Sequence, residues 1–114
     1  MRIWPFTRNR NVSRVSALVR SEVEERFPAE HVGTVVAELE QLEGAINPRG
    51  YDDPYGRDRI QLAVLLYARG DLHRLRSAIE TARVDWRDLL VGCGLANNDW
   101  PDVLSRAGFR VPQP

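Results

Sequence analysis

The sequence contains no lysine, and its sixteen basic residues, all arginine, are balanced by sixteen acidic residues. With a formal net charge of zero, the chain has no overall electrostatic attraction for nucleic acid or for an anionic membrane surface. Because the arginines are spread along the chain, we attribute their exclusive use to a GC-rich, bacterial genome and not to a cluster that binds anions in bidentate fashion.

Cysteine is nearly absent too. Cys93 is the only one, so no intrachain disulfide can form and the sequence does not imply an oxidising compartment. No stretch approaches the run of about 18 apolar residues that a membrane-spanning helix needs. The basic first ten residues are not followed by the apolar segment of a secretory signal. We therefore expect a cytoplasmic protein without a membrane span.

Motifs that bind metals or phosphates are also missing. His31 and His73 are isolated and do not form an H-E-x-x-H pair, and a single cysteine excludes C-x-x-C. The sequence has no P-loop and no G-x-G-x-x-G turn after a strand. Cys93 falls on an apolar helix face, the position of a buried small residue. We expect no metal, no cofactor and no catalytic residue, and the sequence leans against an enzyme.

What the sequence does contain is apolar residues at intervals of three and four, the spacing of one helix face. The first such pattern starts at Asn11, as N-cap, and ends before Pro28. The second covers residues 32–42 and stops at Gly44. Its V-G-T-V-V run is rich in strand-forming valine, but it does not alternate and has no second strand to pair with. We expect a helix there.

A helix over 60–69 is the predicted core element. Between Ile60 and Ala68 only Gln61 is polar, so most of the helix circumference is apolar and other elements must surround it. The narrow polar stripe that remains consists of Arg57, Asp58, Gln61, Ala68 and Arg69.

Glycine stops and aspartate starts mark the helices that follow. The expected stops are Gly70, Gly92 or Gly94, and Gly108, and the expected starts are Asp71, Asp85 and Asp99. Phe109 follows the last stop and is placed to pack on Leu104, the apolar contact of a Schellman motif.

These elements predict an all-α, single-domain orthogonal bundle of about five or six short helices around the central one. The domain covers residues 11–109, with a basic and aromatic arm over 1–10 and a frayed tail over 110–114. A long loop over 44–58 leads into the central helix.

This loop is the first candidate for a binding site, because long loops in small domains are often functional. Its hydrogen-bonding and stacking groups are Tyr51, Asp52, Asp53, Tyr55 and Arg57. The alternative is a packed connector, in which both tyrosines anchor the loop and Asp53 caps a helix opened by Pro54.

Three hypotheses for function follow, of which an enzyme with its site around residues 49–58 is the third. The leading one is a non-catalytic protein-interaction or regulatory module, such as an adaptor or an immunity-type inhibitor, that binds another protein or itself. Trp100 is its candidate anchor, since tryptophan is enriched at interfaces. The charge of the N-terminal half is uneven. Five arginines and no acidic residue precede Glu22, whereas the stretch from Glu22 to Glu43, both included, has seven acidic residues and Arg26 as its only arginine.

The alternative is a nucleic-acid-binding regulator. Two helices joined by a tight glycine turn over 60–83 have the outline of a helix-turn-helix, and the basic arm would add contacts. The zero net charge and the charged residues on both sides of the turn glycine weigh against nucleic acid as the partner. The residues that would contact DNA are Arg74, Arg76, Ser77 and Arg83.

Overall fold

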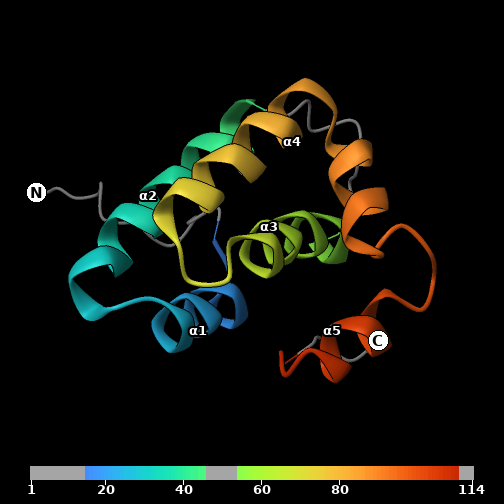
Figure 1. Ribbon diagram of the computed structural model, residues 1–114, viewed down its shortest axis with the longest axis horizontal. Helices are drawn as coiled ribbons and strands as arrows, with labels where there is room; N and C mark the ends of the chain where they lie inside the picture. The colour runs from blue at the N-terminus through green and yellow to red at the C-terminus, as the bar shows by residue number, and fades with distance from the viewer. Residues whose placement is uncertain (1–14, 46–53, 111–114) are drawn as a thin grey trace, which may run out of the picture.

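The computed structural model describes residues 15–45 and 54–110 of the 114-residue chain, and within these ranges all regular structure is helical (Figure 1). The all-α prediction is confirmed, and the valine-rich second segment is a helix as expected. The five helices are α1 (Ala17–Arg26), α2 (Ala29–Ala45), α3 (Pro54–Ala68), α4 (Leu72–Cys93) and α5 (Trp100–Arg106).

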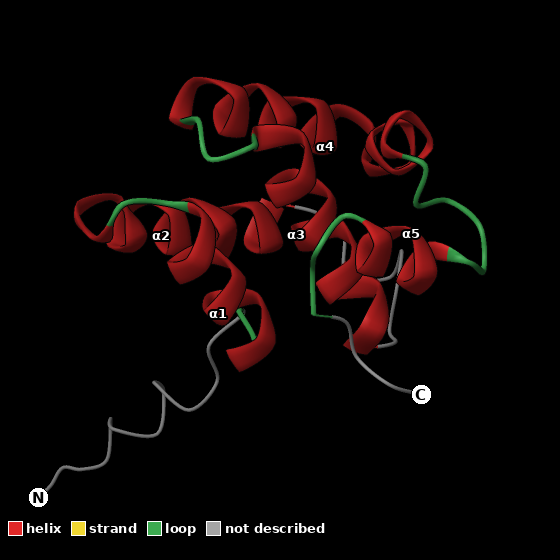
Figure 2. Ribbon diagram, turned by 60° about the horizontal axis from the view of Figure 1, so that its bottom comes forward, coloured by secondary structure: helices red, strands yellow, loops and turns green. Residues whose placement is uncertain are grey.

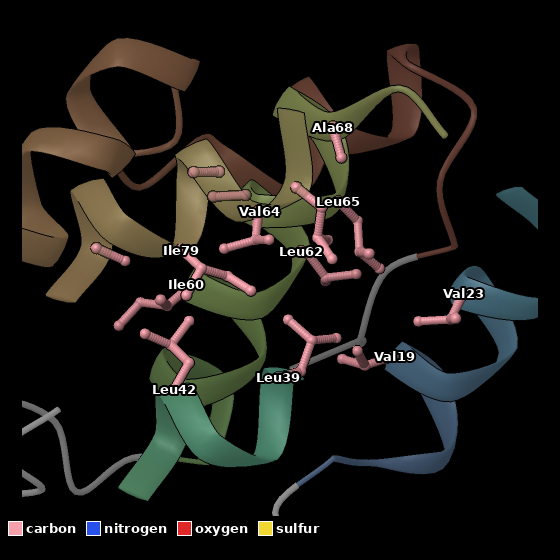
Figure 3. Packing of buried hydrophobic residues seen from close by; sticks show 14 of the residues in the cluster. Val19, Val23, Leu39, Leu42, Ile60, Leu62, Val64, Leu65, Ala68 and Ile79 are labelled. Carbon is pink, nitrogen blue, oxygen red and sulfur yellow. The ribbon is translucent and has the colours of Figure 1, made fainter. Parts of the chain in front are cut away.

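α3 lies at the centre of the fold, with α1 and α4 in direct contact with it (Figure 1). The close view in Figure 3 shows Leu62 and Leu65 of α3 in the same packing region as Val19 of α1 and Leu39 of α2. Each large aliphatic side chain removed from water contributes about 1.5–3 kcal/mol. The predicted central apolar helix is confirmed, and its buried apolar residues are Ile60, Leu62, Ala63, Val64, Leu65 and Ala68.

The predicted polar stripe of α3 is wrong in part. Asp58, Gln61 and Ala68 are buried, whereas Tyr67, which we counted with the core, is 39% exposed. A polar stripe normally faces solvent. Here the start of α1 lies on that side of α3 instead, and the Ser16 hydroxyl donates a hydrogen bond to the Asp58 carboxylate.

α1 begins later than predicted. Its N-cap is Ser16, whose backbone is extended (φ −71°, ψ 164°) and whose hydroxyl accepts a 3.2 Å hydrogen bond from the Val19 N–H. Serine and asparagine are equally good caps, so local preference alone does not choose between position 16 and Asn11. Asn11 itself lies outside the described residues. The predicted end before Pro28 is confirmed, since Phe27 is extended.

The loop predicted over 44–58 is shorter than expected at both ends. α2 runs through Gly44 to Ala45, so that glycine does not stop the helix, and α3 already begins at Pro54. An isolated glycine inside a helix costs only about 1 kcal/mol, which the packing of α2 can offset. Residues 46–53 lie outside the described part of the chain.

The aspartate starts are confirmed with one difference. Asp71 caps α4 by accepting a 2.8 Å hydrogen bond from the His73 N–H. Asp99 precedes α5 as predicted, but its side chain makes no capping hydrogen bond.

The glycine stops are confirmed as well. α4 ends at Gly94 and not at Gly92, because Gly94 has the left-handed backbone conformation (φ 77°). After Gly108 (φ 90°), the Phe109 N–H donates to the Leu104 carbonyl at 3.0 Å, and both side chains are buried. These are the bond and the contact of the predicted Schellman motif.

α4 is bent at Asp85. This residue has an extended backbone (φ −160°, ψ 103°), and its carboxylate accepts a 3.0 Å hydrogen bond from the Arg87 N–H, so it caps a second helical segment. Figures 1 and 2 both show the two segments of α4 meeting at an angle. The predicted helix start at Asp85 is therefore the beginning of the second segment of α4, and it coincides with a sharp bend.

A buried carboxylate attaches the C-terminal segment to α1. Glu22 is 2% exposed and accepts hydrogen bonds from Arg26 Nε (3.1 Å) and from the backbone N–H of Arg110 (3.0 Å). The Arg26 guanidinium also lies 3.5 Å from the centre of the Phe109 ring and donates to the Gly108 carbonyl. Arg110, which we expected to begin a frayed tail, is thus held by α1.

The turn between α3 and α4 approaches the end of α1 closely. Gly70 has φ +78°, and a Cβ atom at this position would lie 2.8 Å from the Arg26 carbonyl oxygen. Gly94 has nearly the same φ, +77°, with nothing within 4 Å of such a Cβ. The two glycines share one backbone conformation and differ only in the space around them.

Gly94→Ala should therefore lower the free energy of unfolding by about 1–2 kcal/mol, the usual cost of a left-handed backbone for alanine. Gly70→Ala should cost about 1–3 kcal/mol more, because its methyl group meets backbone atoms of α1. Urea unfolding followed by circular dichroism measures both variants. Equal losses for the two would contradict the close approach.

Candidate functional site

The residues predicted to form a binding site are only partly within the described structure. Tyr51, Asp52 and Asp53 lie outside it, and Tyr55 is in the first turn of α3, where its side chain is not described. Whether these residues converge stays a prediction. Arg57 and Trp100 can be placed.

Arg57 borders a buried polar cluster. Its neighbour Asp58 is 8% exposed, and burial raises the pKa of the Asp58 carboxyl above its ordinary value of 3.8. The hydrogen bond from Ser16 and the positive charge of Arg57 lower that pKa and offset part of the rise. Among the described residues, Asp58 Oδ1 has no hydrogen-bond partner. This cluster joins the start of α1 to α3.

Trp100 is a packing residue. It is half-buried against the core at the start of α5, and the Arg59 guanidinium lies 5.5 Å from its ring centre. Arg59 also donates a 3.1 Å hydrogen bond to the Leu95 carbonyl. Residues two apart on a helix point in different directions, so Arg57 and Arg59 do not share a face. The structure therefore does not bring Arg57 to Trp100.

Two of the four residues proposed to contact DNA are engaged within the protein. Arg74 Nε donates to the Tyr67 carbonyl at 2.9 Å, and the guanidinium lies 4.4 Å from the Tyr67 ring centre. Arg76 forms a 2.9 Å ion pair with Glu38 of α2. Ser77 and Arg83 are both exposed on α4.

A hollowed surface lies along α4, around its bend. Two hollows adjoin there, and we call them together the elbow groove. The outer hollow, of about 320 Å³, is lined by Ser77, Glu80, Thr81, Val84 and Asp88. The inner hollow, of about 140 Å³, shares Thr81 and Asp88 and adds Tyr67, Ala78, Leu89, Gly92 and Cys93.

Exposed apolar side chains gather along this groove. Val84 is 79% exposed and lies in the outer hollow, and Tyr67 lies in the inner one. Val91, 68% exposed, follows Asp88 by three residues and so continues the same side of the second segment of α4. No other large apolar residue of the described chain is exposed to this degree. Single exposed apolar residues are common, whereas exposed apolar residues grouped in one place are typical of interaction sites in general.

The charged groups of the groove are acidic. Glu80 and Asp88 line the outer hollow, and neither makes an ion pair with any residue in the described ranges. Asp85, between them, is bonded to Arg87. The groove thus combines apolar side chains with two carboxylates that have no ion-pair partner in the described part of the chain.

Cys93 closes the inner hollow as a packing residue. It is half-buried, its thiol lies 3.6 Å from the Ala63 carbonyl oxygen, and burial raises the pKa of the thiol. A raised pKa keeps the thiol protonated at neutral pH, which lowers its reactivity. This agrees with the position expected from the sequence.

The elbow groove was not predicted from the sequence, although the spacing of its residues is a signal for it. Ser77, Thr81, Val84, Asp88 and Val91 recur at steps of four and three, so they mark one side of a continuous helix opposite the core. We expected two separate helices around Asp85, and this hid the shared side.

Comparison of the chain with protein-family models, with curated proteins and with solved structures gives no match. Within the described residues, no group of three or more histidine, cysteine or acidic side chains is placed to hold a metal ion. No helix in the same ranges is long and apolar enough to cross a membrane.

The buried Asp58 gives a test by pH. Its raised pKa favours the protonated form in the folded state, so its contribution to stability is present below pH 3.8 and is lost as the pH rises through the folded-state pKa. Asp58→Asn keeps an acceptor for Ser16 and cannot ionise. The variant should therefore gain stability relative to the wild type between pH 3.5 and pH 7.

Urea unfolding of both proteins at these two pH values measures the difference. The exposed Asp102→Asn is the control, and it should show a smaller change between them. A difference for Asp58→Asn that does not grow with pH would show that the carboxyl is not desolvated.

Proposed function

We propose that this protein is a non-catalytic interaction or regulatory module that binds another protein through the elbow groove. The observation that carries the proposal is that exposed apolar residues occur at this concavity: Val84 and Tyr67 line its two hollows, and the exposed Val91 follows Asp88 by three residues on the second segment of α4. An adaptor or an immunity-type inhibitor in the cytoplasm of a bacterium fits this description, and both are roles expected from the sequence.

The groove has the composition of a docking surface. Interfaces combine an apolar centre with a polar rim, and concave sites receive the anchoring side chains of the partner. In the elbow groove Val84 and Tyr67 supply apolar area, while Ser77, Thr81 and Glu80 supply hydrogen-bonding groups. The outer hollow, about 320 Å³, is at the lower end of the roughly 300–1,000 Å³ of small-molecule sites. It therefore suits one or two side chains of a partner.

Trp100 does not serve this role well, because it is half-buried against the core next to Arg59. Replacing it would remove packing between α5 and α3, and loss of binding could then reflect loss of structure. Val84 and Val91 are mostly exposed, so their replacement should leave the fold intact.

The double variant Val84→Ser/Val91→Ser tests the proposal. A partner is captured from the native lysate with the wild-type protein, identified by mass spectrometry, purified, and titrated by calorimetry against wild type and variant. We expect the variant to bind at least about tenfold more weakly, because apolar anchors each contribute upwards of about 1 kcal/mol.

The matched control is Ala29→Ser/Ala37→Ser, which replaces two exposed apolar residues of α2 with the same polar residue. It should bind like the wild type. Equal affinity of the groove variant and the wild type for the purified partner would show that the groove is not the docking surface.

A further inference from the structure

We infer that the occupant of the elbow groove is a cationic segment of another protein, with an arginine or lysine held between Glu80 and Asp88. The inference rests on the proposed function and adds the chemistry of the partner. It starts from the lining of the outer hollow: two carboxylates, two hydroxyls and one valine, with no basic residue.

The neighbouring arginines do not neutralise these carboxylates. Arg87 is bonded to Asp85 and lies 5.4 Å from the Trp86 ring centre, and Arg74 is stacked on Tyr67. Arg83, exposed and three residues after Glu80, forms no ion pair with Glu80 or Asp88 among the described residues. Ion pairs elsewhere on the helices match acid with base, as Arg76 with Glu38 shows. Within residues 15–45 and 54–110, the outer hollow therefore presents negative charge without an ion-pair partner, and such charge attracts and orients a cation.

The bend brings the two carboxylates to one hollow. Glu80 precedes Asp85 and Asp88 follows it, so the acids come from the two segments of α4 that meet at an angle (Figure 1). Val84 and Thr81 lie between them in the same lining. A long cationic side chain suits this order, since its aliphatic stem packs on apolar surface while its head reaches acceptors. An arginine fork can bond two carboxylates at once.

A second copy of this chain fits the groove poorly. In a symmetric dimer each copy presents the same surface, so an isologous contact here would place a hollow on a hollow. It would also bring Glu80 and Asp88 of one copy towards the same acids of the other, and like charges at an interface are destabilising. Charge complementarity therefore selects a different, basic partner.

Two blocked amphipathic peptides test the inference. One contains leucine, alanine and arginine, and the other has citrulline, the neutral isostere of arginine, at every arginine position. Titration into the isotopically labelled protein is followed by amide chemical shifts. The arginine peptide should shift the amide resonances of residues 77–92, and its affinity should fall in 0.5 M salt. The citrulline peptide should bind at least about tenfold more weakly.

The variant Glu80→Gln/Asp88→Asn should reduce the affinity for the arginine peptide by about tenfold or more, because it removes both charge-assisted acceptors. Glu30→Gln/Asp102→Asn, which removes two exposed acids elsewhere, should leave the affinity unchanged.

Equal binding of both peptides to this groove, unaffected by Glu80→Gln/Asp88→Asn, would overturn the cationic partner while leaving docking at the groove intact. Absence of shifts over 77–92 with the arginine peptide would also overturn it. Docking at the groove is contradicted only if Val84→Ser/Val91→Ser binds the purified partner as tightly as the wild type does. The proposed function and the cationic partner can therefore be rejected separately.

Discussion

The structure depends on covering α3, a helix with apolar residues on nearly every side. At 1.5 Å per residue, α3 is about 22 Å long, whereas the 22 residues of α4 would span about 33 Å if they were straight. A straight α4 would therefore carry part of its apolar face past the end of α3. The break at Asp85 turns the second segment back, and Leu89 and Leu90 become buried in the same core as Leu75 and Ile79. The bend thus satisfies the packing of α3, and the concavity of the elbow groove is its geometric consequence.

Much of this fold follows from local rules, and those parts could be predicted. Asp71 and Asp85 accept from an N–H two residues ahead, and Gly94 and Gly108 adopt the left-handed conformation, so each feature depends only on nearby backbone. The errors arise where two local solutions have similar energy. Asn11 and Ser16 are equivalent caps, and the interaction of Ser16 with Asp58, 42 residues away in a different helix, favours the second. No periodicity in the sequence reports such a contact.

The candidate site was hidden for a related reason. The side of α4 that carries Val84, Asp88 and Val91 was readable as a spacing, but a groove requires the angle between the two segments, and that angle is set by packing on α3. Tyr67 is a similar case: it lies in the apolar run of α3, yet it is 39% exposed and lines the inner hollow together with residues of α4. Tyr51, Asp52 and Asp53 lie outside the described residues, so only the composition of the loop supports them as binding-site candidates.

The formal net charge is zero, but the individual charged residues have different roles in the structure. Glu22 is satisfied in the interior by Arg26 and Arg110, and Glu38 is paired across helices with Arg76. The contacts of Glu22 with Arg110 and of Glu38 with Arg76 each join one element to another, whereas Arg26 bonds Glu22 within α1. Glu80 and Asp88 join no such pair in the described chain, and they line the outer hollow together with Val84, which is 79% exposed. Carboxylates that join no ion pair in the described chain, next to apolar side chains that packing leaves exposed, are the features that support the proposed docking surface. The proposed function is therefore assigned to the elbow groove and not to the centre of α3 or the cluster at Asp58.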